Sequence, residues 1–162
     1  MSSYPKLFQP GRIGALEVPN RIVFAATSTE LADGDGLVTD EMIEFYGERA
    51  RGGTGLIVVE ATYIDQQGKR LKHNLMLHED GCIPGMTRLV DAVHEGGAKI
   101  ALQINHGGRE SVPEVSGSVP LAPSAQVSGF TGVGDAVMPR ELTIAEIEGI
   151  VGRFADAAAR AR

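Results

Sequence analysis

The residues best suited to binding chemistry form the stretch 103–109, which reads Gln-Ile-Asn-His-Gly-Gly-Arg. An apolar run at residues 100–102 ends abruptly at Gln103. Continuous apolar character is typical of a parallel strand buried on both faces, and ligands in such folds collect at the carboxyl ends of the strands. A buried amide must also find hydrogen-bond partners or cost about 1–3 kcal/mol. We therefore expect Gln103 to lie in a binding site.

Further polar side chains follow predicted strands in the same way. His106 and Arg109 lie at the same strand exit as Gln103, although a single His or Arg there could equally satisfy backbone carbonyls or carboxylates. Thr27, Ser28 and Thr29 follow an earlier apolar run. Because Ser and Thr at strand exits often cap turns, a structural role for Ser28 also stays open.

Three strands are predicted to carry these residues, at 21–26, 55–61 and 99–103. The second and third strands each follow a Gly-Gly pair, at residues 52–53 and 96–97, that ends a predicted helix. The two pairs lie 44 positions apart, counted from residue 52 to residue 96. This spacing is typical of repeated βα units and predicts an α/β fold with parallel strands.

The helices between the strands are predicted from their apolar spacing and their first residues. The first begins at Thr39 or Asp40, and the second has Pro84 in its first turn. Both carry one apolar stripe at helical spacing, made of Met42, Ile43, Tyr46 and Ala50 in the first helix and of Met86, Leu89, Val90 and Val93 in the second.

A third helix is predicted to begin with a capping box formed by Thr143 and Glu146. The repeat of strand, helix and glycine pair predicts that a glycine and a fourth strand follow this helix. We therefore expect the sequence to be unfinished at its C-terminus. The alternative is a small complete three-layer domain. Residues 106–140 contain four prolines and no clear period, which predicts a long functional loop. The expected inner face of the third helix consists of Ile144, Ile147, Val151, Phe154, Ala155 and Ala158.

Composition places the chain in the soluble globular class. It has 162 residues, of which 43% are hydrophobic and 22% charged, and no apolar stretch approaches the ~20 residues of a membrane span. A formal net charge of -6 argues against a nucleic-acid partner. The single cysteine, Cys82, cannot form an internal disulfide, and the N-terminus lacks a secretory pattern, so a reducing cytoplasm is expected.

Five motifs together resemble the old yellow enzyme family, in the branch of bacterial ene-reductases and 2,4-dienoyl-CoA reductases. They occur in the family's order and at its spacing across nearly the whole chain. The resemblance implies a TIM barrel of eight βα units, of which residues 1–162 would supply about the first three as an N-terminal part, incomplete at the C-terminus. The motifs are Asn-Arg-Ile-Val-Phe at 20–24, Gly-Leu-Ile-Val-Val-Glu-Ala at 55–61, the stretch 103–109, Leu-Ala-Pro-Ser at 121–124 and Pro-Arg-Glu-Leu-Thr at 139–143.

The resemblance also implies positions for the cofactor and the substrate. It places Asn105, His106 and Arg109 at the substrate pocket. Catalytic residues are expected on a fourth strand that the sequence does not contain, so none is assigned. Where some members have a cysteine that tunes the flavin, this chain has Ser28. The residues that the resemblance places against FMN are Ala25, Ala26, Thr27, Ser28, Ala61 and Gln103.

The function implied is that of an FMN-dependent ene-reductase. Such an enzyme reduces an activated C=C bond of an α,β-unsaturated carbonyl or enoyl-CoA compound with NAD(P)H, here on a small-molecule substrate. The resemblance leaves open whether a 4Fe-4S cluster and FAD belong to a further C-terminal portion. The alternative is a non-catalytic half-barrel subunit, which a second polypeptide would complete or which would form a homo-oligomer.

Three weaker patterns have simpler interpretations. His73, His78 and Cys82 lack metal-ligand spacing, and no metal is predicted. The Asp-Gly-Asp-Gly turn at 33–36 lacks the later ligands of a calcium loop. Gly129, Gly132 and Gly134 do not follow a strand and are interpreted as part of a mobile loop rather than a dinucleotide site.

Overall fold

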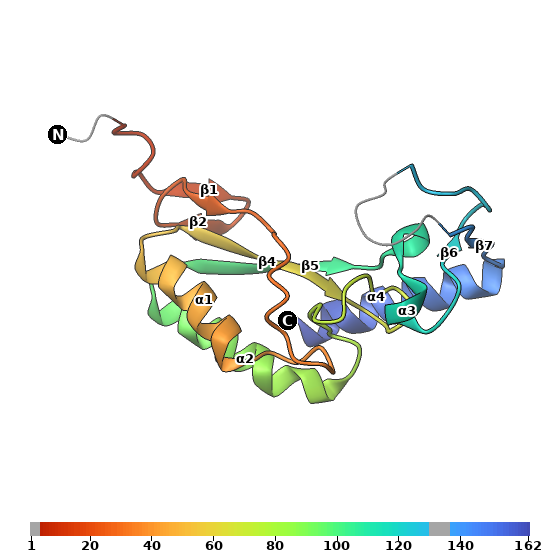
Figure 1. Cartoon of the computed structure of the whole chain (residues 1–162). Coiled ribbons are helices and arrows are strands. Elements are labelled where there is room, and N and C mark those ends of the chain that lie inside the picture. Colours follow the sequence, from red (N-terminus) through yellow and green to blue (C-terminus); the bar gives the residue numbers. More distant parts are fainter. Residues whose placement is uncertain (1–3, 130–136) are drawn as a thin grey trace.

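The computed structural model describes residues 4–129 and 137–162, and its centre is a three-stranded parallel sheet (Figure 1). The strands are β3 (Val23–Phe24), β4 (Leu56–Tyr63) and β5 (Lys99–Asn105), in the order β3-β4-β5. The three predicted strands are therefore confirmed. The first is shorter than predicted, and the other two run two residues further toward their carboxyl ends.

Two helices cover one face of this sheet and lie side by side (Figure 1). They are α1 (Asp40–Arg51) and α2 (Ile83–Glu95). Thr39 caps α1 through a hydrogen bond from the amide of Met42 to its hydroxyl, as predicted. Each helix ends at a Gly-Gly pair whose second glycine has a positive φ, +94° at Gly53 and +88° at Gly97. Glycine adopts this left-handed conformation without steric cost, so the pairs end the helices and start the strands.

The hydrophobic core lies between the helices and the sheet. The side chains on the helix-facing side of β4, Ile57 and Val59, are almost fully buried there. Phe24 of β3 and Leu102 of β5 pack partly against the same cluster. No helix among the described residues covers the opposite face of the sheet, and Ala101 and Gln103 are exposed on it. The helix residues of the core are Met42, Tyr46, Ala50, Leu89 and Val93.

A β-bulge interrupts the pairing of β4 with β5. Val59 pairs with Leu102 and Ala61 pairs with Gln103, so Glu60 is an extra residue in β4. A bulge changes the alternation of side chains along a strand. Val59 and Glu60 are both buried as a result, while Ala61 stays half-buried.

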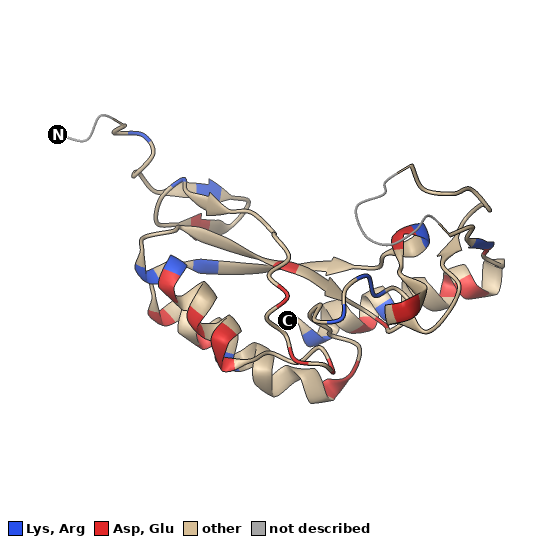
Figure 2. Ribbon diagram, viewed as in Figure 1, with Lys and Arg blue, Asp and Glu red and all other residues tan. Residues whose placement is uncertain are grey.

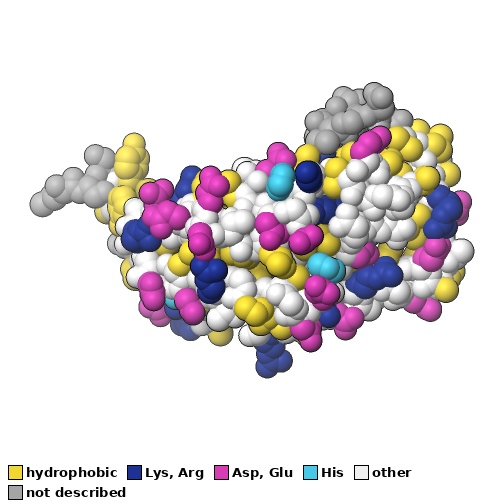
Figure 3. All heavy atoms as spheres, turned by 60° about the horizontal axis from the view of Figure 1, so that its bottom comes forward, with side chains coloured by type: hydrophobic (Ala, Val, Ile, Leu, Met, Phe, Trp, Pro, Cys, Tyr) yellow, Lys and Arg dark blue, Asp and Glu magenta, His cyan; other side chains and the backbone are white. Residues whose placement is uncertain are grey.

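Several short elements flank the sheet. A hairpin of β1 (Gly11–Ile13) and β2 (Leu16–Val18) precedes it, and a 3-10 turn, η1 (Asp80–Cys82), precedes α2. None of these was predicted, because elements of three residues carry too little pattern. In Figure 2, basic and acidic residues are spread over these elements and both helices, and Figure 3 shows charges of both signs interspersed on the helical side.

The stretch 106–140, predicted as a long loop, contains short regular elements. They are η2 (Gly108–Glu110), α3 (Pro113–Ser116), β6 (Leu121–Ala122) and β7 (Arg140–Glu141). β6 pairs with β7 in parallel, which joins the middle of the stretch to its C-terminal end. The predicted mobile loop with Gly132 and Gly134 lies outside the described residues.

The third predicted helix is α4 (Ile144–Arg160), and its capping box is confirmed. Its predicted inner face, however, is mostly open: Ile144 is 72% and Val151 63% exposed. The reason is that α4 packs on the sheet mainly at β5, and of its residues only Ala157 is buried within the described chain. None of the described helices is both long and apolar enough to cross a membrane.

Candidate functional site

The carboxyl ends of the three strands bring Ala25, Ala61 and Gln103 to one face of the sheet. Ala61 and Gln103 are register partners, and Gln103 is exposed. Phe24 pairs with Ile57 and packs against the core, so the next residue, Ala25, faces the opposite side by strand alternation. Residues from three separate parts of the sequence therefore share the face that no helix covers.

This face combines small side chains with one amide. The methyl groups of Ala25, Ala61 and Ala101 leave the backbone of three neighbouring strands accessible. A planar ring can approach such a surface closely, and the Gln103 amide can both donate and accept hydrogen bonds at its polar edge. The donor set and the free space thus fit a flat heteroaromatic ligand such as a flavin ring.

The segment that follows β3 borders this face. Ala26 is half-buried, while Thr27 and Ser28 are exposed. The Thr27 hydroxyl donates to the Ala25 carbonyl at 3.3 Å, which ties it to its own turn. Ser28 follows the carboxyl end of β3 by four residues and, with Thr27 and Thr29, lines a shallow hollow next to α1.

Glu60 binds Thr29, the residue that follows Ser28. Glu60 is not among the site residues expected from the sequence. Its side chain is fully buried, and its Oε2 accepts hydrogen bonds from the Thr29 amide and hydroxyl and from the Tyr46 hydroxyl. Burial raises the pKa of Glu60 above its ordinary value, and burial likewise raises the pKa of Tyr46. A carboxylate inside the apolar run 55–61 was the signal that could have identified it.

Asn105 lies at the end of β5, opposite Tyr63 of β4. Its side chain hydrogen-bonds the Tyr63 hydroxyl, a bond that favours the ionised phenol, but burial dominates and raises the pKa of Tyr63. Asn105 is half-buried, two residues beyond Gln103 on the same strand. Strand alternation therefore places Asn105 and Gln103 on the same side of β5.

The side chains of His106 and Arg109 lie in different surroundings. The His106 side chain is only 7% exposed, and its Nδ1 accepts a hydrogen bond from the Gly108 amide at 2.9 Å. Its Nε2 lies 3.4 Å from Asp65 Oδ1, and the ring occupies the space where a side chain at Gly68 would stand. Burial lowers the pKa of His106. Arg109, in contrast, is exposed on η2.

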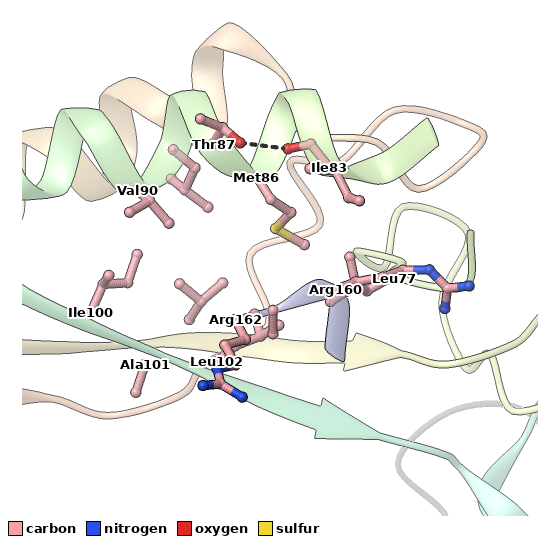
Figure 4. A pocket seen from close by; sticks show the side chains of 13 residues that line it. Leu77, Ile83, Met86, Thr87, Val90, Ile100, Ala101, Leu102, Arg160 and Arg162 are labelled. Atoms are coloured by element: carbon pink, nitrogen blue, oxygen red, sulfur yellow. Dashed lines mark hydrogen bonds between the residues drawn. The ribbon is translucent and has the colours of Figure 1, made fainter. Parts of the chain in front are cut away.

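An apolar groove of about 300 Å³ lies between α2, β5 and the end of α4. Figure 4 shows Met86 and Val90 of α2 pointing toward Ile100 and Leu102 of β5, with Arg160 to one side. The groove is on the helical side of the sheet, away from Gln103. Among the described residues, no group of three or more His, Cys, Asp or Glu side chains could hold a metal ion.

Comparisons with known proteins agree with this geometry. The sequence matches the NADH:flavin oxidoreductase / NADH oxidase family over residues 6–162. It is 46% identical to an NADH oxidase of Thermoanaerobacter brockii over 164 residues, which cover 100% of this chain and 25% of that protein.

Two solved structures are similar over nearly the whole chain. A 2-naphthoyl-CoA reductase in complex with 2-naphthoyl-CoA has a TM-score of 0.90 and 32% identity, covering 98% of this chain and 26% of that one. An old yellow enzyme homologue from Zymomonas mobilis has a TM-score of 0.87 and 34% identity, covering 97% of this chain and 45% of that one. The chain thus spans from a quarter to less than half of the length of these three relatives.

Proposed function

This chain belongs to the NADH:flavin oxidoreductase / NADH oxidase family, and from that premise we propose that it forms one wall of an FMN site in an ene-reductase. The enzyme would use NAD(P)H to reduce the activated C=C bond of an α,β-unsaturated carbonyl or enoyl-CoA compound. The observation that carries the proposal is the shared face of Ala25, Ala61 and Gln103 at the carboxyl ends of three parallel strands.

The fold supports this placement of the site. Old yellow enzymes are TIM barrels, and the three strands with α1, α2 and α4 form about three βα units of such a barrel. In TIM barrels the active site lies at the carboxyl ends of the strands. We propose that residues 1–162 are an N-terminal part of that FMN-binding barrel.

Each residue of the face has a distinct role in the proposed site. Ala25 and Ala61 leave room for a flat ring, and the Gln103 amide pairs with the donors and acceptors of its polar edge. The Ser28 hydroxyl donates a hydrogen bond that stabilises negative charge on the reduced ring. FMN, when bound, supplies the hydride transfer from NAD(P)H to the C=C bond.

The substrate pocket is proposed at the end of β5. The exposed Arg109 can attract the negative charge of a substrate carboxylate or of a CoA thioester's phosphates, and Asn105 supplies an amide nearby. The 2-naphthoyl-CoA complex among the similar structures supports the CoA-thioester class. His106 is a weaker candidate than these two, because its ring is already packed against Gly68 and Asp65.

FMN titration tests this function. The chain, alone and with any co-purifying polypeptide, is titrated against FMN by flavin fluorescence and absorption. We expect Gln103→Leu to weaken binding about tenfold, since it removes hydrogen bonds to the ring edge. Lys99→Gln, at the other end of the same strand, is the matched control and should bind as the wild type does. The proposal is refuted if FMN binds neither to the chain alone nor to the chain with its co-purifying polypeptide. It is also refuted if Gln103→Leu binds FMN as tightly as the wild type does.

A second candidate function is a half-barrel subunit that assembles with a partner chain. In the part of the chain that the structure describes, β5 pairs with β4 alone, which leaves one strand edge open. The apolar stripe of α4, with Val151 63% and Phe154 36% exposed, lies on the same side. The partner that fits is an α/β segment whose strand pairs with β5 and whose helix covers α4.

Light scattering distinguishes the two candidates. A colourless chain that associates, and whose association is abolished by Val151→Glu on α4, supports the subunit function. Asp156→Asn on the same helix is the control, because Asp156 is also exposed but lies away from the apolar stripe. A yellow, monomeric chain with stoichiometric FMN contradicts it.

A further inference from the structure

Glu60 gathers three hydrogen bonds on a single carboxylate oxygen inside the protein. Its Oε2 accepts from the Thr29 amide at 3.1 Å, from the Thr29 hydroxyl at 2.5 Å and from the Tyr46 hydroxyl at 3.1 Å. The Tyr46 oxygen in turn accepts from the Glu60 amide at 3.1 Å, which closes the arrangement. Hydrogen bonds to an ionised acceptor are about twice as strong as neutral ones. Glu60 thus joins β4, α1 and the segment after β3.

Burying the Glu60 carboxylate costs folding free energy, so its hydrogen bonds are expected to have a specific role. Glu60 has no exposed surface, and its other oxygen, Oε1, has no hydrogen-bond partner among the described residues. Desolvating a carboxylate is expensive, and an apolar side chain would fill the same space at lower cost. What the carboxylate adds is a defined position for Thr29.

The position of Thr29 sets the path of the chain on both of its sides. Its hydroxyl also accepts from the Leu31 amide at 3.2 Å. Glu30, between them, has a φ of +57° and is the one described non-glycine residue in the left-handed region. A residue with a side chain keeps this conformation when its surroundings impose it. Here the chain is held on both sides of Glu30, at Thr29 by its bonds to Glu60 and at Leu31 by bonds to the hydroxyls of Thr29 and Thr39.

We propose that Glu60 is a positioning residue: by clamping Thr29 it fixes the preceding Ser28, and so the place where the Ser28 hydroxyl meets the ligand of the sheet face. The inference rests on the proposed FMN site, because that site gives Ser28 its partner. Glu60 itself contacts no ligand in this scheme. It acts through Thr29, and the bulge in β4 is the feature that turns it toward Thr29.

The matched pair Thr29→Val and Thr29→Ser tests the clamp. Valine keeps the shape of threonine but removes the hydroxyl, whereas serine keeps the hydroxyl. Glu60→Leu removes the acceptor, and Thr87→Val on the exposed part of α2 is the control for a Thr-to-Val change elsewhere. The readouts are amide hydrogen exchange at residues 29–31, FMN affinity and the flavin reduction potential, measured in the form of the protein that retains FMN.

We expect Thr29→Val to speed exchange at Thr29 and Leu31 about tenfold, to weaken FMN binding several-fold and to shift the potential. Thr29→Ser should restore all three properties, and Thr87→Val should change none. If Thr29→Val folds and exchanges faster but keeps wild-type FMN affinity and potential, Glu60 is a stabilising residue only and the proposal is overturned. If the wild type itself binds no FMN, the proposed function fails first, and this inference fails with it.

Discussion

Ala61 of β4 and Gln103 of β5 are register partners one residue beyond the bulge at Glu60. The bulge is what lets them share a face, because without the extra residue Gln103 would pair with Glu60 instead. It also turns Glu60 toward Tyr46 on α1. One extra residue in β4 therefore arranges both the open face of the sheet and the buried hydrogen-bond network behind it.

A larger side chain at Ala61 is expected to block that face. Ala61→Leu adds three carbons where the proposed ring lies, so FMN affinity should fall at least tenfold while the fold is kept. The measurement is a fluorescence titration with FMN, accompanied by circular dichroism. Ala145→Leu, at an exposed position of α4 outside its apolar stripe, is the matched control and should not change binding. Tight FMN binding by Ala61→Leu would show that the ring lies elsewhere.

Gly36 is expected to tolerate no side chain. Its φ is +83°, and a Cβ there would stand 2.1 Å from Met76 Cγ, a buried atom that cannot move freely. Gly36→Ala should lower the free energy of unfolding by about 2–4 kcal/mol, from strain and overpacking together. Gly34→Ala is the control in the same turn, since nothing lies within 4 Å of its Cβ position. Urea unfolding measures both, and equal stabilities would contradict the predicted clash.

The stability of the protein should depend on the ionisation of Glu60. Burial raises its pKa above the ordinary 4.5, so the folded state holds the proton more tightly than the unfolded state. The stability it contributes is fully present below pH 4.5 and is lost as the pH rises through the folded-state pKa. From about pH 4.5 upward we expect the wild type to lose stability relative to Glu60→Gln, which cannot ionise. Urea unfolding from pH 4 to 8 checks this, and parallel curves would argue against it.

Glu146 is expected to titrate far below its ordinary range. The Arg140 hydrogen bonds, followed by those from Thr143, lower the pKa of Glu146 to about 2. This group stabilises the folded state above pH 4.5, and its contribution is lost as the pH falls through about 2. NMR titration of the Glu146 carboxyl carbon measures the value. In Arg140→Gln the pKa should rise toward 4.5, and a wild-type value already near 4.5 would rule out the ion pair in solution.

Features that depend on neighbouring residues were predictable from the sequence. The Gly-Gly ends of α1 and α2 and the Thr143–Glu146 capping box are local, because each is completed within one turn of helix. The three parallel strands followed from apolar runs placed between these helices. Gln103, in contrast, was expected as a buried amide where the strand ends, and it is instead exposed within β5, two residues before the end of that strand.

Features that depend on distant residues were not predictable from pattern. No pattern indicates that the His106 ring packs against Gly68 of another loop. The apolar spacing of α4 predicts an inner face, yet Val151 is exposed within the described chain. The bulge at Glu60 follows no local signal either.

The sequence alone thus determined the order of the three sheet strands and of α1, α2 and α4, and the family to which the chain belongs, because periodicity, caps and motifs each lie within short stretches. Only the tertiary structure decided that Glu60 clamps Thr29, 31 residues away, and that Ala61 stands beside Gln103. The physical reason is that a one-residue bulge changes which side of a strand each side chain faces, and pairing with another strand, rather than local propensity, sets the bulge.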